Sequence, residues 1–185
     1  LDWYDIHKRT LPWRDIVTPY GSLVSEIMLQ QTRVETVKPY FSTFMKSFPT
    51  VEVLADATQD SVLAHWSGLG YYTRARNLHK AAQKIVELGS FPSTVDSIRE
   101  LTGVGGYISG DIASIDFNID SPAVDGNHRR VLSRISRNPG NRTDMCGLAW
   151  ALLPKRRAGD FNHSLMDLGS QVCKTRNPDC SKCPV

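Results

Sequence analysis

The sequence has 185 residues, with 22 Lys and Arg against 19 Asp and Glu, and a formal net charge of +3. This length allows one medium domain or two small lobes, which can fold without disulfides. The mild positive charge is compatible with nucleic acid but too weak to indicate it. No apolar run approaches the ~20 residues of a membrane helix, and the first residues lack the pattern of a signal peptide. We therefore expect an intracellular protein without a membrane partner.

The periodicity of apolar residues is helical almost everywhere, and no stretch alternates long enough to predict a strand. The first apolar stripe covers residues 23–28, and the second covers 34–44 with a kink expected at Pro39. Between them, Thr32 and Glu35 have the spacing of a capping box. This spacing predicts a helix that starts at Thr32 and leaves residues 29–31 at a junction between helices.

Further helices are predicted by apolar stripes at 78–86, 98–101, 131–135 and 165–172. The break at 67–70 precedes the first of these stripes. The glycine run 102–106 follows the second, and a helix is expected to restart near Tyr107. The sequence thus predicts an all-α protein of about eight to ten short helices, with no internal repeat or linker.

The glycine run Leu101-Thr102-Gly103-Val104-Gly105 lies between two predicted helices. Glycines allow a tight turn and a close approach of backbone N–H groups to an anion, and the next helix adds the positive end of its dipole. This arrangement suits a phosphate of nucleic acid. An ordinary turn between two helices would also explain the glycines.

Two carboxyl groups stand in contrasting local sequences. Glu26 lies within an apolar stripe, where a carboxyl has a raised pKa and can act as a general acid; a solvated helix face is the alternative. Asp125 lies at a helix start, where a carboxylate stays ionised, although an N-cap role alone would explain it. Cleavage of a glycosidic C–N bond requires such a pair, because one group protonates the leaving group and the other stabilises a cationic sugar.

Three of the four cysteines, Cys173, Cys180 and Cys183, fall within eleven residues, and Cys146 stands apart. Clustered cysteines favour a metal or iron–sulfur site over a disulfide framework. Their spacing matches no zinc-finger pair. Basic residues are interleaved with them: Lys174, Arg176 and Lys182.

Four more segments complete a resemblance to a known family: Leu11-Pro12-Trp13-Arg14, Ser25-Glu26-Ile27-Met28-Leu29-Gln30-Gln31-Thr32, Gly68-Leu69-Gly70-Tyr71-Tyr72 and Val124-Asp125-Gly126-Asn127. The glycine run is similar to a helix–hairpin–helix motif, with Thr102 where Pro is usual. The cysteine spacing is similar to the first three positions of a four-cysteine [4Fe–4S] pattern. Over essentially the whole chain, the sequence resembles the catalytic part of MutY-type adenine-DNA glycosylases, in the helix–hairpin–helix superfamily of endonuclease III.

The resemblance implies an all-α, two-lobed helix–hairpin–helix DNA glycosylase fold with a C-terminal iron–sulfur cluster loop. Residues 16–122 would form a six-helix barrel lobe with the hairpin at 101–107, and residues 1–15 with 123–185 a second lobe that binds DNA across a cleft with the first. A [4Fe–4S] cluster would be held by Cys173, Cys180 and Cys183, and the fourth ligand of the pattern falls beyond Val185. The chain is expected to be a trimmed piece that lacks the family's 8-oxoguanine-reading domain.

The resemblance also implies roles for single residues. Glu26 would protonate adenine and Asp125 would stabilise the sugar cation, with Tyr107 and Asn127 supporting them. The expected residues that contact DNA or the base are Trp13, Arg14, Leu29, Gln30, Gln31, Thr32, Tyr71, Gly103, Gly105 and His163. Among these, Gln31 would fill the gap left by the extruded adenine, and Tyr71 would wedge into the partner strand. His163 departs from the Gln or Glu that usually reads an adenine edge.

The implied function is base excision repair, in which adenine paired with 8-oxoguanine or guanine is removed from double-stranded DNA by acid-catalysed hydrolysis. The enzyme would be a monofunctional monomer, since a lyase needs Lys where this chain has Tyr107. One alternative is another glycosylase of the superfamily, acting on thymine mismatches or oxidised pyrimidines. The other is a non-catalytic DNA-binding module with a structural metal. The compartment would be the nucleus or mitochondrion in a eukaryote and the cytoplasm in a bacterium.

Overall fold

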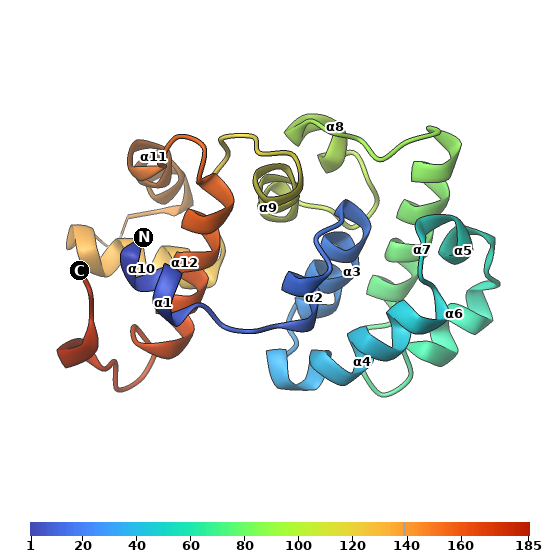
Figure 1. Ribbon diagram of the computed structural model, residues 1–185, viewed down its shortest axis with the longest axis horizontal. Helices are drawn as coiled ribbons and strands as arrows, with labels where there is room; N and C mark the ends of the chain where they lie inside the picture. The colour runs from blue at the N-terminus through green and yellow to red at the C-terminus, as the bar shows by residue number, and fades with distance from the viewer. Residues whose placement is uncertain (139) are drawn as a thin grey trace. The chain divides into compact units, whose positions relative to one another are not determined.

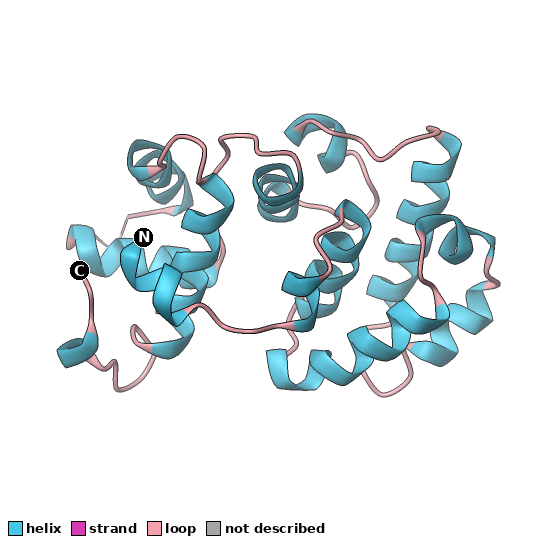
Figure 2. Cartoon of the chain, viewed as in Figure 1, coloured by secondary structure: helices cyan, strands magenta, loops and turns pink. Residues whose placement is uncertain are grey.

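The computed structural model describes residues 1–138 and 140–185. These residues contain twelve α-helices, one 3-10 helix and no strand, which confirms the all-α prediction (Figure 2). The number of helices exceeds the expected eight to ten. The difference comes from helices of four to six residues that show no clear period: α1 (Asp2–His7), α2 (Pro12–Asp15) and α5 (Val51–Asp56). Helix α8 (Val95–Arg99) is equally short, but the stripe at 98–101 predicted it.

The chain divides into two compact units, which we call the central unit, Thr10–Ile108, and the terminal unit, Leu1–Arg9 with Ser109–Val185. Figure 1 labels the helices of both. Besides α2, α5 and α8, the central unit contains α3 (Pro19–Leu29), α4 (Val34–Ser47), α6 (Gln59–His65) and α7 (Thr73–Glu87). Besides α1, the terminal unit contains α10 (Gly126–Ser136), α11 (Arg142–Leu152), α12 (Ala158–Gln171) and η1 (Cys180–Lys182). Helix α9 (Gly106–Asp116) begins in the first and ends in the second.

Helix α3 lies at the core of the central unit. Pro19 occupies its first turn, and the Thr18 hydroxyl accepts a hydrogen bond from the backbone N–H of Gly21 at 3.0 Å, which caps the helix. Every residue from Tyr20 to Met28 is buried, and α2, α4 and α7 all pack on the helix. A helix that is apolar on nearly all sides needs such cover, because each face must leave water.

The core of the terminal unit forms where α10 packs on α11 and α12. The buried residues that share it are Val124, Val131, Leu132, Met145, Ala149, Leu165, Leu168 and Val172. Helix α1 packs on α12, and the fully buried carboxylate of Asp167 accepts hydrogen bonds from the backbone N–H and the Nε of Arg9, at 3.0 and 2.6 Å. These bonds satisfy a buried charge that would otherwise be costly. They also hold the first nine residues on the C-terminal helix.

The boundaries of the two units lie between residues 9 and 10 and between residues 108 and 109. The sequence predicted lobe boundaries between residues 15 and 16 and between residues 122 and 123. The buried amide of Asn162 on α12 accounts for the second boundary. Its Nδ2 donates to the Ser114 hydroxyl at 2.9 Å and to the Ser121 carbonyl at 3.0 Å, and its Oδ1 accepts from the Ala123 N–H at 3.0 Å. The end of α9 and the segment after it are thereby held on α12.

One predicted helix start is wrong. Helix α4 begins at Val34 after Arg33, with no side-chain cap, and the Thr32 hydroxyl instead donates to the carbonyl of Gln30 at 3.4 Å. The capping-box spacing fails because Arg33 is still extended, with a φ of −72° and a ψ of 145°, and is itself the N-cap. The restart near Tyr107 is confirmed, since α9 begins at Gly106. Among the described helices, none has the length and apolarity needed to cross a membrane.

Candidate functional site

The guanidinium of Arg74 joins the C-terminal end of α3 to the loop that precedes α7. This side chain is buried in α7, and its Nη1 donates to the carbonyls of Ile27 and Met28, at 3.3 and 2.7 Å, and to that of Gln30. Its Nη2 donates to the carbonyls of Leu69 and Gly70 at 3.3 and 3.2 Å. The carbonyls at the C-terminal end of a helix have no partner within the helix, so Arg74 both satisfies them and fixes the chain that follows.

Gln31 and Tyr71 follow directly on the two segments that Arg74 holds. Both have left-handed backbone, with φ of 56° and 48°, and both are exposed, the tyrosine at 61%. A left-handed conformation costs free energy in a residue other than glycine and persists only where its surroundings impose it. The structure thus presents to solvent the two side chains that the sequence predicts to enter DNA.

The glycine run forms a tight turn between α8 and α9. Gly103 has a φ of 86°, and a Cβ built there would lie 2.8 Å from the Cβ of Asn77 on α7. Its carbonyl accepts a hydrogen bond from the Nε2 of Gln30 at 3.2 Å, so the turn and the end of α3 lie side by side. Gly105 is exposed, with open space around its Cβ position.

The other predicted site residues of the central unit differ in burial. Glu26 is 6% exposed within α3, and Tyr107 on α9 is half-buried. Leu29 ends α3 and is half-buried, as are Gln30 and Thr32. Trp13 is 8% exposed and packs edge-on against Phe41, with 5.6 Å between ring centres, and the neighbouring Arg14 is half-buried.

Asp125 precedes α10 in the terminal unit and is its N-cap. Its Oδ1 accepts hydrogen bonds from the backbone N–H of His128 at 2.8 Å and from His128 Nδ1 at 2.7 Å, and its Oδ2 accepts from the Nδ2 of Asn127 at 2.8 Å. Burial alone would raise the pKa of Asp125. The hydrogen bonds and the electrostatic attraction of His128, with the Asn127 bond, outweigh it and hold the pKa below its ordinary value. A lowered pKa favours the ionised carboxylate at neutral pH.

Asn127 connects Asp125 to the cysteine segment through Arg130. The Nη2 of Arg130 donates to the Oδ1 of Asn127 at 2.7 Å and to the carbonyl of Gly169 at 2.8 Å, and its Nε donates to the carbonyl of Cys173 at 2.8 Å. Asn127 therefore bonds Asp125 through its amide nitrogen and Arg130 through its amide oxygen.

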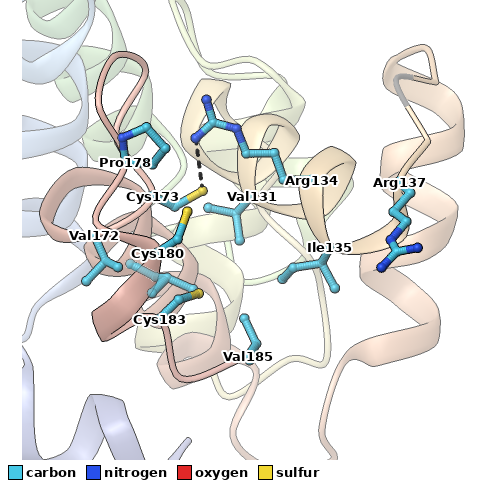
Figure 3. A pocket seen from close by; sticks show the side chains of 11 residues that line it. Val131, Arg134, Ile135, Arg137, Val172, Cys173, Pro178, Cys180, Cys183 and Val185 are labelled. Atoms are coloured by element: carbon cyan, nitrogen blue, oxygen red, sulfur yellow. Dashed lines mark hydrogen bonds between the residues drawn. The ribbon is translucent and has the colours of Figure 1, made fainter.

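Three of the cysteines line one cavity of about 280 Å³, together with residues of α10 and α12 (Figure 3). They are Cys173, Cys180 and Cys183. The Nη1 of Arg134 donates to the sulfur of Cys173 at 3.3 Å and to the carbonyl of Lys174 at 2.8 Å. Within the described part of the chain, no three His, Cys, Asp or Glu side chains are close enough to bind a metal ion together. The structure thus places Cys173, Cys180 and Cys183 around one cavity, but not close enough together to bind a metal ion as a group.

His163 lies on α12, half-buried, with its Nδ1 3.4 Å from the hydroxyl of Tyr4. Two residues that matter to this geometry were missed from the sequence. Arg74 gave no signal, because its partners lie up to 47 positions away. His128 did have one, since it stands three positions after the capping Asp125 on the apolar stripe of α10.

A model of the HhH-GPD superfamily of base excision DNA repair proteins matches residues 24–149. The adenine DNA glycosylase of Buchnera aphidicola subsp. Baizongia pistaciae is 42% identical over 192 residues, covering 100% of this chain and 55% of that protein. The adenine DNA glycosylase of Homo sapiens is 43% identical over 202 residues, covering 100% of this chain and 37% of that protein. This chain therefore spans only part of the length of the curated relatives it matches.

Solved structures show the same fold. A thermostable thymine-DNA glycosylase superposes with a TM-score of 0.90 and 27% identity, covering 99% of this chain and 88% of that chain. A trapped endonuclease III–DNA covalent intermediate superposes with a TM-score of 0.81 and 21% identity, covering 90% and 81%. The family model covers more than half of the sequence. This chain belongs to the HhH-GPD superfamily of base excision DNA repair proteins.

Proposed function

We propose that this chain is the catalytic part of an adenine DNA glycosylase that removes adenine opposite 8-oxoguanine or guanine in double-stranded DNA. The observation that carries the proposal is the contrast between two carboxyl groups. Glu26 is buried at 6% exposure within the apolar α3, whereas Asp125 is held ionised by three hydrogen bonds. Two relatives that match the chain over its whole length are adenine DNA glycosylases.

The two carboxyls have separate roles in the proposed hydrolysis. A carboxyl in apolar surroundings favours its protonated form, so Glu26 is the acid that protonates adenine as the glycosidic C–N bond breaks. The departing base leaves a sugar with cationic character, which the negative charge of Asp125 stabilises. Asn127 holds Asp125, and Tyr107 supports the chemistry at Glu26.

DNA binding is proposed to depend on the turn at Gly103 and the two left-handed residues. Backbone N–H groups at the turn and the start of α9 bind phosphates, which positions the duplex without reading its sequence. Tyr71 wedges into the partner strand and Gln31 fills the gap left by the extruded adenine, which offsets part of the few kcal/mol that extrusion costs. The remaining proposed contacts to DNA or base are Trp13, Arg14, Leu29, Gln30, Thr32, Gly105 and His163.

The enzyme is proposed to be monofunctional. A lyase attacks the sugar with an amine and passes through a Schiff base, but the position expected to carry that lysine holds Tyr107, a phenol that cannot form an imine. Borohydride added during turnover should therefore trap little protein on DNA. Efficient trapping would place the chain with the lyases instead.

We propose that Cys173, Cys180 and Cys183 provide three thiolates to a [4Fe–4S] cluster. The fit rests on their common cavity and on the cationic Arg134 beside the sulfur of Cys173, which suits an ionised thiolate. Cys146 is the one other cysteine of the sequence, and the fourth ligand is proposed to follow Val185. When bound, the cluster would order the basic segment around Lys174 and Lys182. A protein extended past Val185 and purified without oxygen should be brown, and stoichiometric zinc without iron would contradict this assignment.

A thymine mismatch glycosylase is the second candidate, because the thymine-DNA glycosylase structure superposes over 99% of this chain. Single-turnover base release from duplexes with A·8-oxoG, A·G, T·G or thymine glycol separates the two. We expect release of adenine from the first two duplexes only. Release of thymine alone would favour the second candidate, and release from none would leave a DNA-binding module.

The proposed protein acts as a monomer, in the nucleus or mitochondrion of a eukaryote or the cytoplasm of a bacterium.

The acid is tested by replacing Glu26 with Gln, which is nearly isosteric but cannot deliver a proton. General acid catalysis contributes about 10²–10⁴ in rate, so Glu26→Gln should lower adenine release by at least about a hundredfold and change duplex affinity only a few-fold. Glu35→Gln, on the exposed side of α4, is the matched control and should release adenine normally. Turnover of Glu26→Gln within threefold of the parent would show that Glu26 is not the acid.

A further inference from the structure

His128 is a fully buried imidazole that faces a carboxylate. Its side chain is 0% exposed and that of Asp125 is 22% exposed, with 2.7 Å between His128 Nδ1 and Asp125 Oδ1. The residue lies on the stripe of α10 that also carries the buried Val131 and Leu132. An apolar side chain would suit that stripe equally well, so burial alone does not account for a histidine here.

The hydrogen bonding of the ring is one-sided. The buried Nε2 has no hydrogen-bond partner among the described residues, so the contact with Asp125 is the one side-chain hydrogen bond recorded for the imidazole. Burying a polar ring costs free energy unless its hydrogen bonds are replaced. The contact with Asp125 offsets this cost at Nδ1 only, which ties the ring to the carboxylate.

The direction of this hydrogen bond follows from the chemistry of the acceptor. An ionised carboxylate has no hydrogen to give, so Nδ1 of His128 carries the hydrogen and donates it. Oδ1 then receives two bonds, from the backbone N–H and the imidazole of His128, and Oδ2 receives one from Asn127. Three donors, two from His128 and one from Asn127, therefore fix the plane of the carboxylate as well as favouring its charge.

We propose that His128 is a positioning residue for Asp125: its Nδ1–H holds the carboxylate in one orientation for stabilising the sugar cation. The proposal rests on the proposed function, because it assigns a task to Asp125 in that reaction. His128 does not contact the reacting atoms itself. Its contribution acts through Asp125 and is therefore absent when Asp125 is replaced.

Among the described residues, the other charged groups on α10 and on the helices packed against it have no recorded hydrogen bond to the Asp125 carboxylate, and Arg129 on α10 is exposed. Helices α11 and α12 pack against α10. On α11, Asp144 accepts a hydrogen bond from the backbone N–H of Asn141. On α12, Asp160 bonds Arg157, His163 lies beside Tyr4, and Asp167 bonds Arg9. On α10 itself, Arg130 bonds Asn127 and Arg134 bonds the Cys173 segment. None of these bonds reaches the carboxylate of Asp125, so the side chains that donate to it are His128 and Asn127.

Three variants separate the hydrogen bond from the packing. His128→Val removes the donor but keeps an apolar side chain on the stripe. His128→Asn puts an amide N–H close to the place of Nδ1, and His128→Gln puts one closer to that of Nε2. All three keep the backbone N–H that Asp125 caps. Hydrogen bonds to charged groups correspond to about 10-fold to 100-fold in an equilibrium or rate, so we expect adenine release to fall at least tenfold in His128→Val and His128→Gln and to recover in His128→Asn.

The pH profile distinguishes positioning from packing. Because the reaction needs Asp125 ionised, loss of a donor raises the pKa of Asp125 and with it the pH at which release begins to fail on the acid side. His128→Asn should return that limb to its original position. In an Asp125→Asn background, His128→Val should produce no further loss. Equal loss in all three variants with an unmoved acid limb would overturn the proposal and leave His128 as a packing residue.

A measurement that needs no turnover keeps this test separate from the proposed function. In protein labelled with ¹³C at aspartate carboxyls, the Asp125 signal is assigned by its absence in Asp125→Asn and followed against pH. It should titrate at higher pH in His128→Val than in the parent or in His128→Asn. If the parent releases no base but this shift is present, the proposed function fails and the role of His128 on Asp125 stands. No shift would overturn that role even in an active enzyme.

Discussion

The guanidinium carbon of Arg74 lies 5.3 Å from the centre of the Tyr71 ring, and its nitrogens bond the carbonyls of Leu69 and Gly70 just before that ring. The same group bonds the carbonyls at the end of α3. A buried arginine with five backbone partners is thus the common support of Tyr71 and Gln31. We therefore expect both left-handed residues to relax when this side chain is lost.

Replacement of Arg74 by Met tests this support. The change leaves several buried carbonyls without a donor, and a single hydrogen bond to a charged group contributes about 1.5–3 kcal/mol, so we expect a loss of about 3 kcal/mol in the free energy of unfolding. Arg76→Met, two positions on and exposed on the same helix, should change it by less than about 0.5 kcal/mol. Denaturant unfolding measures both. Similar values for the two variants would show that Arg74 supports nothing.

Tyr71→Ala should weaken base extrusion more than it weakens non-specific DNA binding. A stacked base–aromatic contact contributes about 1–3 kcal/mol, whereas phosphate contacts do not involve this ring. Fluorescence of an adenine analogue in the duplex reports extrusion, and titration with fully paired duplex reports non-specific binding. Tyr72→Ala is the matched control, because Tyr72 is exposed but has an ordinary φ of −58°. Equal losses on mismatched and fully paired DNA would remove the wedge role of Tyr71.

The two glycines of the turn between α8 and α9 should respond differently to alanine. At Gly103, Ala would be strained by the positive φ of 86° and by a Cβ only 2.8 Å from the Cβ of Asn77. We therefore expect Gly103→Ala to lower the free energy of unfolding by about 1–3 kcal/mol and to weaken duplex binding. At Gly105, the Cβ meets open space within the protein, so Ala should leave stability nearly unchanged. Thermal unfolding and duplex titration of both variants provide the comparison. A loss of stability in Gly105→Ala as large as that in Gly103→Ala would contradict the turn geometry.

Local chemistry made part of this fold and site predictable. The restart of the chain at α9 follows from glycines that permit a tight turn, and the start of α10 follows from the capping Asp125. Both depend on residues within a few positions of one another. The carboxylate of Asp125 could be assigned as ionised for the same reason, since its donors belong to Asn127 and His128.

Features set by distant contacts were not predictable. The capping box at Thr32 has the right spacing, but Arg33 is extended and occupies the N-cap position instead. The boundary between the two units depends on Asn162, whose amide bonds residues about 40 positions earlier. The donor to the Cys173 sulfur, Arg134, is likewise 39 positions away. Such pairs leave no periodic signal, because neither residue type nor spacing marks them.

The stability of the protein should carry a contribution from Asp125 that disappears in acid. Folding lowers the pKa of this carboxyl from its ordinary value of 3.8, because the bonds of His128 and Asn127 outweigh burial. A group with a lowered folded pKa stabilises the protein fully above the unfolded value and loses that contribution as the pH falls through the folded value. Subtracting the unfolding free energy of Asp125→Asn from that of the parent isolates it, since both share every other acidic group. The Asn side chain keeps an acceptor at the N-cap, so the variant is expected to fold.

The difference should be constant from pH 7 to about pH 5 and should shrink below about pH 4. Denaturant unfolding at a series of pH values measures it. In a His128→Val background, the same subtraction should give a smaller difference at pH 7, since the lost donor brings the folded pKa of Asp125 closer to its unfolded value. A difference that stays constant down to pH 3 would mean that the hydrogen bonds do not stabilise the ionised form. The sign is opposite to that of a group whose folded pKa is raised, which would stabilise the protein more as the pH falls.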